Sequence, residues 1–198
     1  MRKEPRQERS RQMVERIVEA GRAVLIRDGY ARFATTRVAD QAGISPGSLY
    51  QYFRDKDELL AVIMERYWTE MGDRVAASLA DRLSDPPGRL VPNVVEALLS
   101  ALEQDSQLLR IAVEEVPPSY REGRLHDLRR RIQDLSSAYL AGRSSEARRG
   151  AARAWVLVSA MEALSVRWVL DRPPIRREEL VEELTTLATN YLAGAKAI

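Results

Sequence analysis

Two short helices joined by a tight turn are predicted between residues 35 and 56, where the chain reads TTRVADQAGISPGSLYQYFRDK. Thr35 or Thr36 can cap the first helix, because a threonine hydroxyl accepts a backbone N–H that has no partner within the helix. Gly43 is expected to end that helix, since glycine adopts the left-handed conformation most easily. Ser45 is expected to cap the second helix. The pattern predicts a helix-turn-helix, whose second helix enters the DNA major groove.

The predicted second helix carries small and polar residues on the face that it does not bury. Leu49 and Phe53 are four residues apart and are expected to face the protein. Gly47 and Ser48 are small, so the start of the helix can approach base edges or a phosphate closely. Gln51 carries a donor and an acceptor on one amide, which suits adenine. This face therefore has the chemistry of a DNA-reading surface.

The hydroxyls of Tyr50 and Tyr52 and the ammonium of Lys56 suit phosphate oxygens, which set register but carry no sequence information. The alternative is that both tyrosines merely cover the core. The full set of DNA-contact candidates is Thr35, Thr36, Arg37, Ser45, Gly47, Ser48, Tyr50, Gln51, Tyr52 and Lys56.

The segment from about Ser10 to Met71 resembles the DNA-binding domain of the tetracycline-repressor (TetR) family. The residues that carry the resemblance are Gly29, Phe33, Thr35, Thr36, Ala39, Ala42-Gly43-Ile44-Ser45, Gly47-Ser48-Leu49-Tyr50-Gln51-Tyr52-Phe53 and Lys56. The resemblance covers about a third of the chain. Ala34 and Pro46 depart from it, because family members often carry polar residues there, so base reading is expected to depend on fewer side chains.

The resemblance implies a dimeric, ligand-responsive transcriptional regulator, most often a repressor of a palindromic operator. It implies that the last two helices of each subunit form a four-helix bundle, and that an unknown small-molecule effector binds in the C-terminal part. Whether such a protein represses or activates depends on where its operator lies. A sensor or protein-interaction module of the same fold without operator binding is the alternative.

Of the 198 residues, 45% are hydrophobic and 30% are charged, which is the composition of an ordinary soluble globular protein. The chain has no cysteine, which excludes disulfides and thiolate metal sites. The first residues, MRKEPRQERSRQ, lack the apolar core of a secretory signal. No apolar run approaches the ~20 residues that span a bilayer. We therefore expect a cytoplasmic protein without membrane contact.

Charge is unevenly distributed along the chain. Residues 1–56 hold 12 Lys or Arg against 7 Asp or Glu, whereas the rest hold 19 against 22. A basic N-terminal third is typical of a phosphate-facing module. The first residues could form an arm that touches phosphate or the minor groove, although a frayed, solvated tail is the favoured interpretation. The basic residues of this segment are Arg2, Lys3, Arg6, Arg9 and Arg11.

Hydrophobic periodicity predicts helices throughout and no strands. The first helix is expected from about Ser10 to Asp28, and a long connector of ~42 Å from about 56 to 83. A break is expected at Asp85-Pro86-Pro87-Gly88. Further helices are expected over about 90–104, 106–116, 119–141, 145–171 and 175–194.

The predicted fold is all-α: an N-terminal three-helix helix-turn-helix domain, joined by a long helix to a C-terminal helical ligand-binding and dimerisation domain. The DNA-binding domain is expected at 9–57, within a family-type domain of about 10–71. The effector-binding and dimerisation domain is expected at 58–198. The last two helices have broad apolar surfaces, which indicates burial on two sides. One side can be the monomer core and the other a partner subunit; a thick monomer core is the alternative.

A small-molecule pocket is expected in the C-terminal part. Its candidate lining residues are Tyr67, Trp68, Met71, Leu102, Val113, Tyr120, Leu128, Trp155, Val158, Met161 and Glu162. Ordinary core packing is an equally good interpretation of any one of them. Glu162 lies within an apolar pattern and would contact a cationic or hydroxylated ligand or, as we favour, pair with an arginine such as Arg153 or Arg167.

No catalytic, cofactor or metal site is predicted. His126 is the only histidine and has no other ligand-type residues at metal-binding spacing. The chain has no glycine-rich phosphate loop, nucleophile elbow or second histidine for a triad. Adjacent acids such as Glu114-Glu115 diverge around a helix and are interpreted as solvated faces. An enzyme that uses the C-terminal cavity is therefore disfavoured.

Overall fold

The computed structural model of this chain describes residues 5–80, 82, 84–120, 130, 132–139 and 147–193. These residues form helices joined by turns, with no strand among them, so the predicted all-α fold is confirmed. The elements are α1 (Pro5–Asp28), the 3₁₀ turn η1 (Tyr30–Arg32), α2 (Thr35–Ala42), α3 (Pro46–Leu49), α4 (Lys56–Ala80), α5 (Pro87–Gln104), α6 (Ser106–Arg110), the π-helical turn η2 (Ile111–Glu115), the 3₁₀ turn η3 (Pro118–Tyr120), α8 (Ala147–Asp171) and α9 (Arg177–Ala193).

The described residues divide into two compact units. Unit 1 contains those of 1–67 and 107–123, and unit 2 contains those of 68–106 and 124–198. Helix α4 therefore begins in unit 1 and ends in unit 2, and the chain returns to unit 1 through α6. The domain boundary expected from the sequence, between residues 57 and 58, assigned residues 107–123 to the C-terminal domain, whereas here they group with unit 1.

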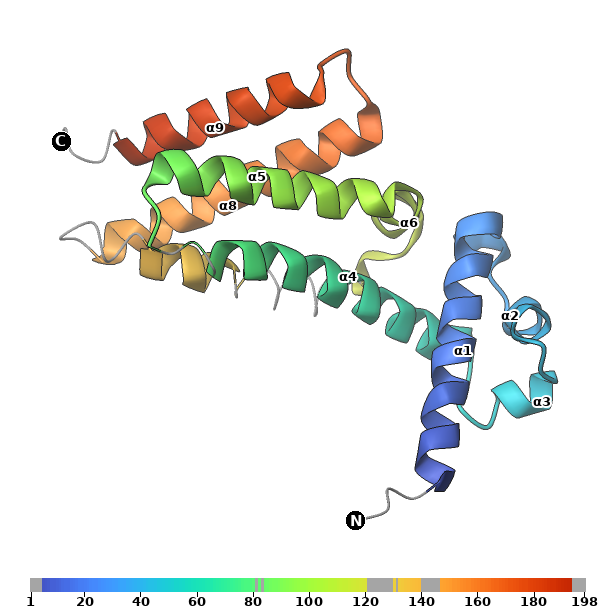
Figure 1. Cartoon of the computed structure of the whole chain (residues 1–198). Helices are drawn as coiled ribbons and strands as arrows, with labels where there is room; N and C mark the ends of the chain where they lie inside the picture. Colours follow the sequence, from blue (N-terminus) through green and yellow to red (C-terminus); the bar gives the residue numbers. More distant parts are fainter. Residues whose placement is uncertain are drawn as a thin grey trace. The chain divides into compact units, whose positions relative to one another are not determined.

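In unit 1, α1 packs along α2 and closely against the first half of α4 (Figure 1). Gly21 makes the close approach to α4 possible, because a Cβ there would lie 2.6 Å from the Ile63 side chain. Arg66 of α4 donates to Glu15 of α1, with Nη2 2.7 Å from Oε1. The core between these helices is aliphatic and is formed by Ile17, Val18, Val24, Leu25, Val38, Leu49, Leu59, Leu60, Ile63 and Met64.

Helix α1 begins at Pro5, so the expected start near Ser10 is wrong. Proline suits the first position of a helix because its missing N–H would have no partner there. The preference for a frayed tail is also wrong for Arg9 and Arg11, which are exposed side chains of the helix. Arg2 and Lys3 lie outside the described residues.

In unit 2, α5 packs against both α8 and α9 (Figure 1). Its apolar face joins that of α9 in a core cluster that comprises Val91, Val95, Leu99, Leu180, Leu184 and Ala188. Arg177 links the start of α9 to α5. Its Nε donates to Glu103 Oε2 at 3.0 Å and its Nη2 donates to Ser100 Oγ at 3.1 Å. No helix among the described residues is both long and apolar enough to cross a membrane.

The connector α4 ends at Ala80 after 25 residues, slightly earlier than expected. The break after it lies at Asp85-Pro86, and α5 already includes Pro87 and Gly88. The helix expected over 119–141 begins differently, since Pro118–Tyr120 is a 3₁₀ turn. Residues 132–139 are helical, and 121–129 lie outside the described residues.

Candidate nucleic-acid interface

The first helix of the helix-turn-helix, α2, has no side-chain cap. Its N-cap is Ala34, in extended conformation, so the prediction that Thr35 or Thr36 caps the helix is wrong. Thr35 already has helical backbone, and its hydroxyl finds a tertiary partner instead. Its Oγ1 lies 2.9 Å from the hydroxyl of Tyr50, and the residue is only 8% exposed. This pair links α2 directly to the residue that follows α3.

The turn between α2 and α3 is confirmed in detail. Gly43 has a left-handed backbone, with φ 65° and ψ 38°. The N–H groups of Gly43 and Ile44 donate to the carbonyls of Asp40 and Ala39 at 3.1 and 3.0 Å, which is the Schellman arrangement. Ser45 caps α3, because its Oγ accepts the Ser48 N–H at 3.1 Å.

Helix α3 is shorter than the sequence indicates, since it comprises only Pro46–Leu49. Two turns continue it, in which the N–H groups of Tyr52 and Phe53 donate to the Leu49 carbonyl at 2.9 and 3.1 Å. Leu49 and Phe53 are buried, as predicted. The other residues of the segment are Gly47 and Gln51, both exposed, Ser48 and Tyr52, both half-buried, and Tyr50, which is 51% exposed. The Tyr50 ring therefore does not simply cover the core.

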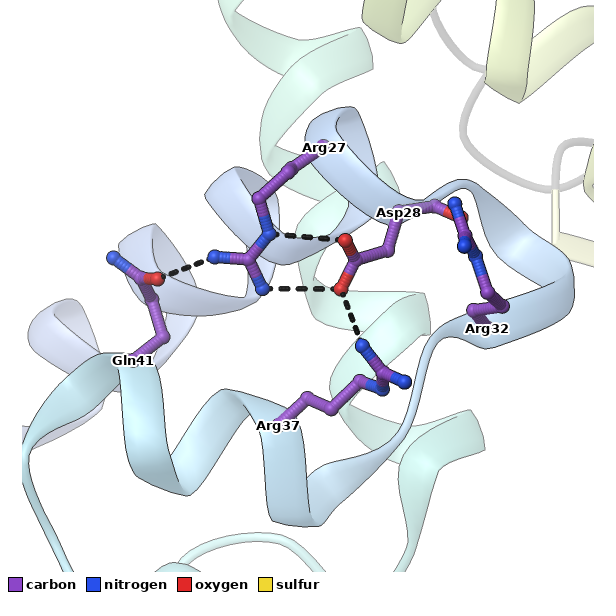
Figure 2. Close-up of polar contacts among 5 residues, drawn as sticks. All are labelled: Arg27, Asp28, Arg32, Arg37 and Gln41. Carbon is purple, nitrogen blue, oxygen red and sulfur yellow. Dashed lines mark hydrogen bonds and ion pairs between the residues drawn. The ribbon is translucent and has the colours of Figure 1, made fainter.

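The end of α1 is fastened to α2 by Asp28 (Figure 2). The Asp28 carboxylate accepts Nε and Nη2 of Arg27 at 2.9 and 3.0 Å, and Nη1 of Arg37 at 3.2 Å. Arg27 also donates to Gln41 Oε1 at 2.9 Å. These hydrogen bonds, first from Arg27 and then from Arg37, lower the pKa of Asp28 to about 2 against the opposing effect of burial. Arg37, a DNA-contact candidate, thus already has a carboxylate partner while its side chain is half exposed.

The start of α4 is capped by Asp55, whose Oδ1 accepts the N–H groups of Asp57 and Glu58 at 3.0 and 2.8 Å. Asp55 and Glu58 have the spacing of a capping box. Glu58 Oε2 accepts the N–H of Arg54 at 2.7 Å, one residue before the cap, and this bond lowers the pKa of Glu58. Lys56 is exposed, and its Nζ lies 5.6 Å from the centroid of the Tyr30 ring. The DNA-contact candidate Thr36 is also exposed.

One residue far along the chain, Glu115, contacts the turn after α1, and sequence reasoning missed this role. Glu115 Oε2 accepts the N–H of Tyr30 at 2.9 Å, although 85 residues separate the two. Glu114 and Glu115 are both exposed, as interpreted, but Glu115 also makes this long-range hydrogen bond, whereas Glu114 pairs with Arg110 at 3.1 Å. No local pattern signals such a long-range hydrogen bond.

Tyr120, a pocket candidate, lies beside the start of α4. Burial, followed by the interaction with Asp57, raises the pKa of its phenol to about 12. The phenol therefore stays protonated, and able to donate, at neutral pH.

The other pocket candidates are divided between the two units. Tyr67 and Val113 belong to unit 1 with Tyr120, and the remaining described candidates belong to unit 2. Tyr67, Trp68, Met71 and Leu102 are buried, whereas Val113, Tyr120, Val158, Met161 and Glu162 are half-buried and Trp155 is 60% exposed. Met161 packs against the α5–α9 core cluster. Leu128 and the sole histidine, His126, lie outside the described residues.

Unit 2 contains a hollow of about 350 Å³ with other lining residues, which are Glu103, Ser106, Trp168, Val169, Arg172 and Pro173. Arg167 pairs with Asp171 at 3.0 Å. Within the described ranges, no group of three His, Asp or Glu residues is placed to hold a metal ion.

Known proteins resemble the chain over both parts of its length. Residues 17–63 match the family model described as bacterial regulatory proteins, tetR family, and residues 86–192 match the tetracyclin repressor-like C-terminal domain. An HTH-type transcriptional regulator of Mycobacterium tuberculosis strain H37Rv is 26% identical over 208 residues, which span 94% of this chain and 78% of that protein.

Solved structures share the fold. A TetR-like transcriptional regulator from Rhodococcus sp. RHA1 matches with a TM-score of 0.63 and 26% identity, over 97% of this chain and 100% of that chain. The multidrug binding protein EbrR, complexed with imidazole, matches with a TM-score of 0.65 and 22% identity, over 90% and 93% of the two chains. The second likeness shows the fold alone.

A capped helix-turn-helix on a helical scaffold, followed by a second helical unit, defines a DNA-binding transcriptional regulator. The chain belongs to the TetR family, which confirms the resemblance carried by residues 10–71.

Proposed function

We propose that this protein is a transcriptional repressor that binds a palindromic operator as a homodimer and is released by a small-molecule effector. The observation that carries the proposal is the exposed face beside α3, where Gly47, Tyr50 and Gln51 lie outside the core while Leu49 and Phe53 anchor the segment. Small residues and a bidentate amide at this position allow close approach to base edges. Such a regulator acts in the cytoplasm, where the DNA is.

In this proposal the DNA-binding domain is 9–57 and the remaining 58–198 bind effector and partner. Gly47, Ser48 and Gln51 approach the bases, and the other candidates contact phosphate and set the register. These others are Thr35, Thr36, Arg37, Ser45, Tyr50, Tyr52 and Lys56. Thr35 acts indirectly, because its hydroxyl is committed to Tyr50.

Exposed apolar side chains on the last two helices support dimerisation. One side of α8 and α9 packs on α5, whereas large apolar residues elsewhere on both helices remain exposed. These residues are Trp155, Val156, Leu164, Leu187 and Tyr191. Large exposed apolar side chains can mark a protein–protein interface. A two-fold axis through it would place two recognition segments on half-sites ~34–36 Å apart.

The effector is proposed to be a small organic molecule. The structure of EbrR with imidazole supports a ligand role for this fold, and the buried aromatics Tyr67 and Trp68 are available to line a site. To shift the protein from 1:99 to 99:1 in favour of the released form, the effector must prefer that form about 10⁴-fold.

Selection of random duplex DNA by the purified protein tests the proposal, with binding of the enriched duplex then measured across salt. We expect an inverted repeat, bound at ~10⁻⁸–10⁻¹¹ M with a steep salt dependence. A non-selected duplex of equal length is the control. If no sequence is enriched from protein refolded free of bound small molecules, operator binding is refuted and a same-fold sensor is favoured.

A further inference from the structure

We propose that Glu115 is a positioning residue for DNA binding: it holds Tyr30 so that Lys56, which lies against the Tyr30 ring, is presented to a phosphate. The proposal rests on the operator binding proposed above. All of these residues belong to unit 1. The contact of Glu115 with Tyr30 joins two segments that are 85 residues apart in the sequence.

The first contact caps the turn after α1. The N–H of Tyr30 begins the 3₁₀ turn η1, where a backbone donor has no partner within the turn. Glu115 Oε2 accepts it at 2.9 Å. Gly29 precedes it with φ 75°, and a Cβ there would lie 3.1 Å from the same Glu115 oxygen. The positive φ and the close approach of Glu115 both favour glycine at position 29. The absence of a side chain at Gly29 therefore leaves room for the Glu115 carboxylate to reach the Tyr30 N–H.

The second step leads from Tyr30 to Lys56. The Lys56 ammonium lies 5.6 Å from the Tyr30 ring centroid, within the range of a cation–π interaction. Lys56 is the first residue of α4, so the helix sets its backbone while the Tyr30 ring sets one side of its side chain.

The segment that supplies Glu115 is anchored independently of it. Leu108, Leu109 and Ala112 are fully buried within the same stretch, whereas the Glu115 side chain is exposed. Replacement of Glu115 is therefore expected to leave unit 1 folded and to change chiefly the placement of Tyr30 and Lys56.

Five variants test the role of Glu115 on the enriched operator duplex. Glu115→Ala removes the acceptor, and Glu115→Gln keeps an amide oxygen that can accept the same N–H. Glu114→Ala is the matched control, because the neighbouring carboxylate pairs with exposed Arg110. Lys56→Ala, alone and combined with Glu115→Ala, closes a double-mutant cycle.

We expect Glu115→Ala to weaken binding roughly fivefold and to lower the salt slope by about 1, the loss of one phosphate contact. Glu115→Gln should restore both values, and Glu114→Ala should leave both unchanged. The Lys56→Ala and double variants should bind alike, because Glu115 acts through Lys56. An unchanged slope in Glu115→Ala, or full additivity in the cycle, overturns the positioning role.

Amide hydrogen exchange at Tyr30 provides a readout that needs no DNA. Glu115→Ala should speed exchange at this amide and Glu115→Gln should not; equal exchange in wild type and Glu115→Ala refutes the cap. Tyr30→Leu serves as a second probe if Glu115→Ala fails to fold, because it removes the ring beside Lys56, and it should weaken binding with the same fall in salt slope. Failure of the wild type to bind any duplex refutes the proposed function, whereas wild-type binding with an unchanged slope in the variants refutes the positioning alone.

Discussion

A hydroxyl pair shows how single residues shape the DNA-reading face. Thr35 Oγ1 and the Tyr50 hydroxyl are 2.9 Å apart, with Thr35 buried and Tyr50 half exposed. A phenol hydroxyl can donate one hydrogen bond and accept others, so Tyr50 retains capacity for a phosphate while Thr35 holds its ring. The same contact supplies the buried Thr35 hydroxyl with a partner.

Gly47 is the residue at which the proposed DNA approach can be tested most directly. Glu at this position should abolish operator binding, because it places bulk and negative charge where a phosphate or base edge approaches. The fold should tolerate it, since the nearest atom to a Cβ at Gly47 is Ser45 Oγ at 3.9 Å. Gel-shift titration with the enriched duplex and thermal unfolding measure the two effects, with Gly47→Ala as the steric control. Retained binding by Gly47→Glu would contradict the orientation proposed for α3.

Asp28 is expected to make stability depend on pH. Its pKa is lowered from 3.8 to about 2 by its arginine partners, so the native state favours the carboxylate. This contribution is complete above the unfolded pKa and is lost as the pH falls from about 4 through 2. Urea unfolding across this range should show wild type losing stability more steeply than Asp28→Asn. Parallel curves for the two proteins would show that the hydrogen bonds to Asp28 contribute nothing to folding.

At the scale of elements, the helix-turn-helix contains two glycines with different backbone conformations. Gly43 has a positive φ, whereas Gly47 lies within α3. Gly43→Ala should lower the free energy of unfolding by about 1 kcal/mol, because a Cβ strains the left-handed conformation. Gly47→Ala should be neutral or stabilising, since alanine is the better helix former. Urea unfolding of both variants measures the contrast, and equal effects would contradict the argument.

The recognition element is one capped helical turn and not a long helix. Ser45 and Pro46 begin it, and the buried side chains of Leu49 and Phe53 hold the turns that follow. A four-residue helix has little stability of its own. Its geometry therefore depends on α1, α2 and the start of α4, which explains why Asp28 and Asp55 are used to fasten those neighbours.

At the scale of the whole molecule, the proposed dimer makes a prediction about assembly. Leu187 of α9 is 48% exposed, and Leu187→Glu should shift the protein from dimer to monomer because it places a charge in the apolar interface. Sedimentation velocity at micromolar concentration checks this. Thr69→Glu, an exposed substitution on α4, is the charge-matched control and should remain dimeric. A Leu187→Glu protein that stays dimeric would move the interface elsewhere.

Local sequence chemistry predicted much of the helix-turn-helix. The left-handed Gly43, the Ser45 cap and the buried Leu49 and Phe53 follow from backbone preferences and four-residue spacing. These are short-range effects, so a stretch of some twenty residues contains the information that determines them. The all-α fold and the family followed from the same patterns.

Tertiary structure alone decided which polar groups meet. The Thr35 hydroxyl bonds to Tyr50 instead of capping α2, and Glu115 reaches Tyr30 across 85 residues. A glutamate in the sequence suits a solvated position and a long-range hydrogen bond equally well. The sequence therefore does not distinguish these two roles for an exposed carboxylate. Which of Glu114 and Glu115 turns toward the helix-turn-helix depends on the path of the chain between α6 and η3, and only the folded protein specifies that path.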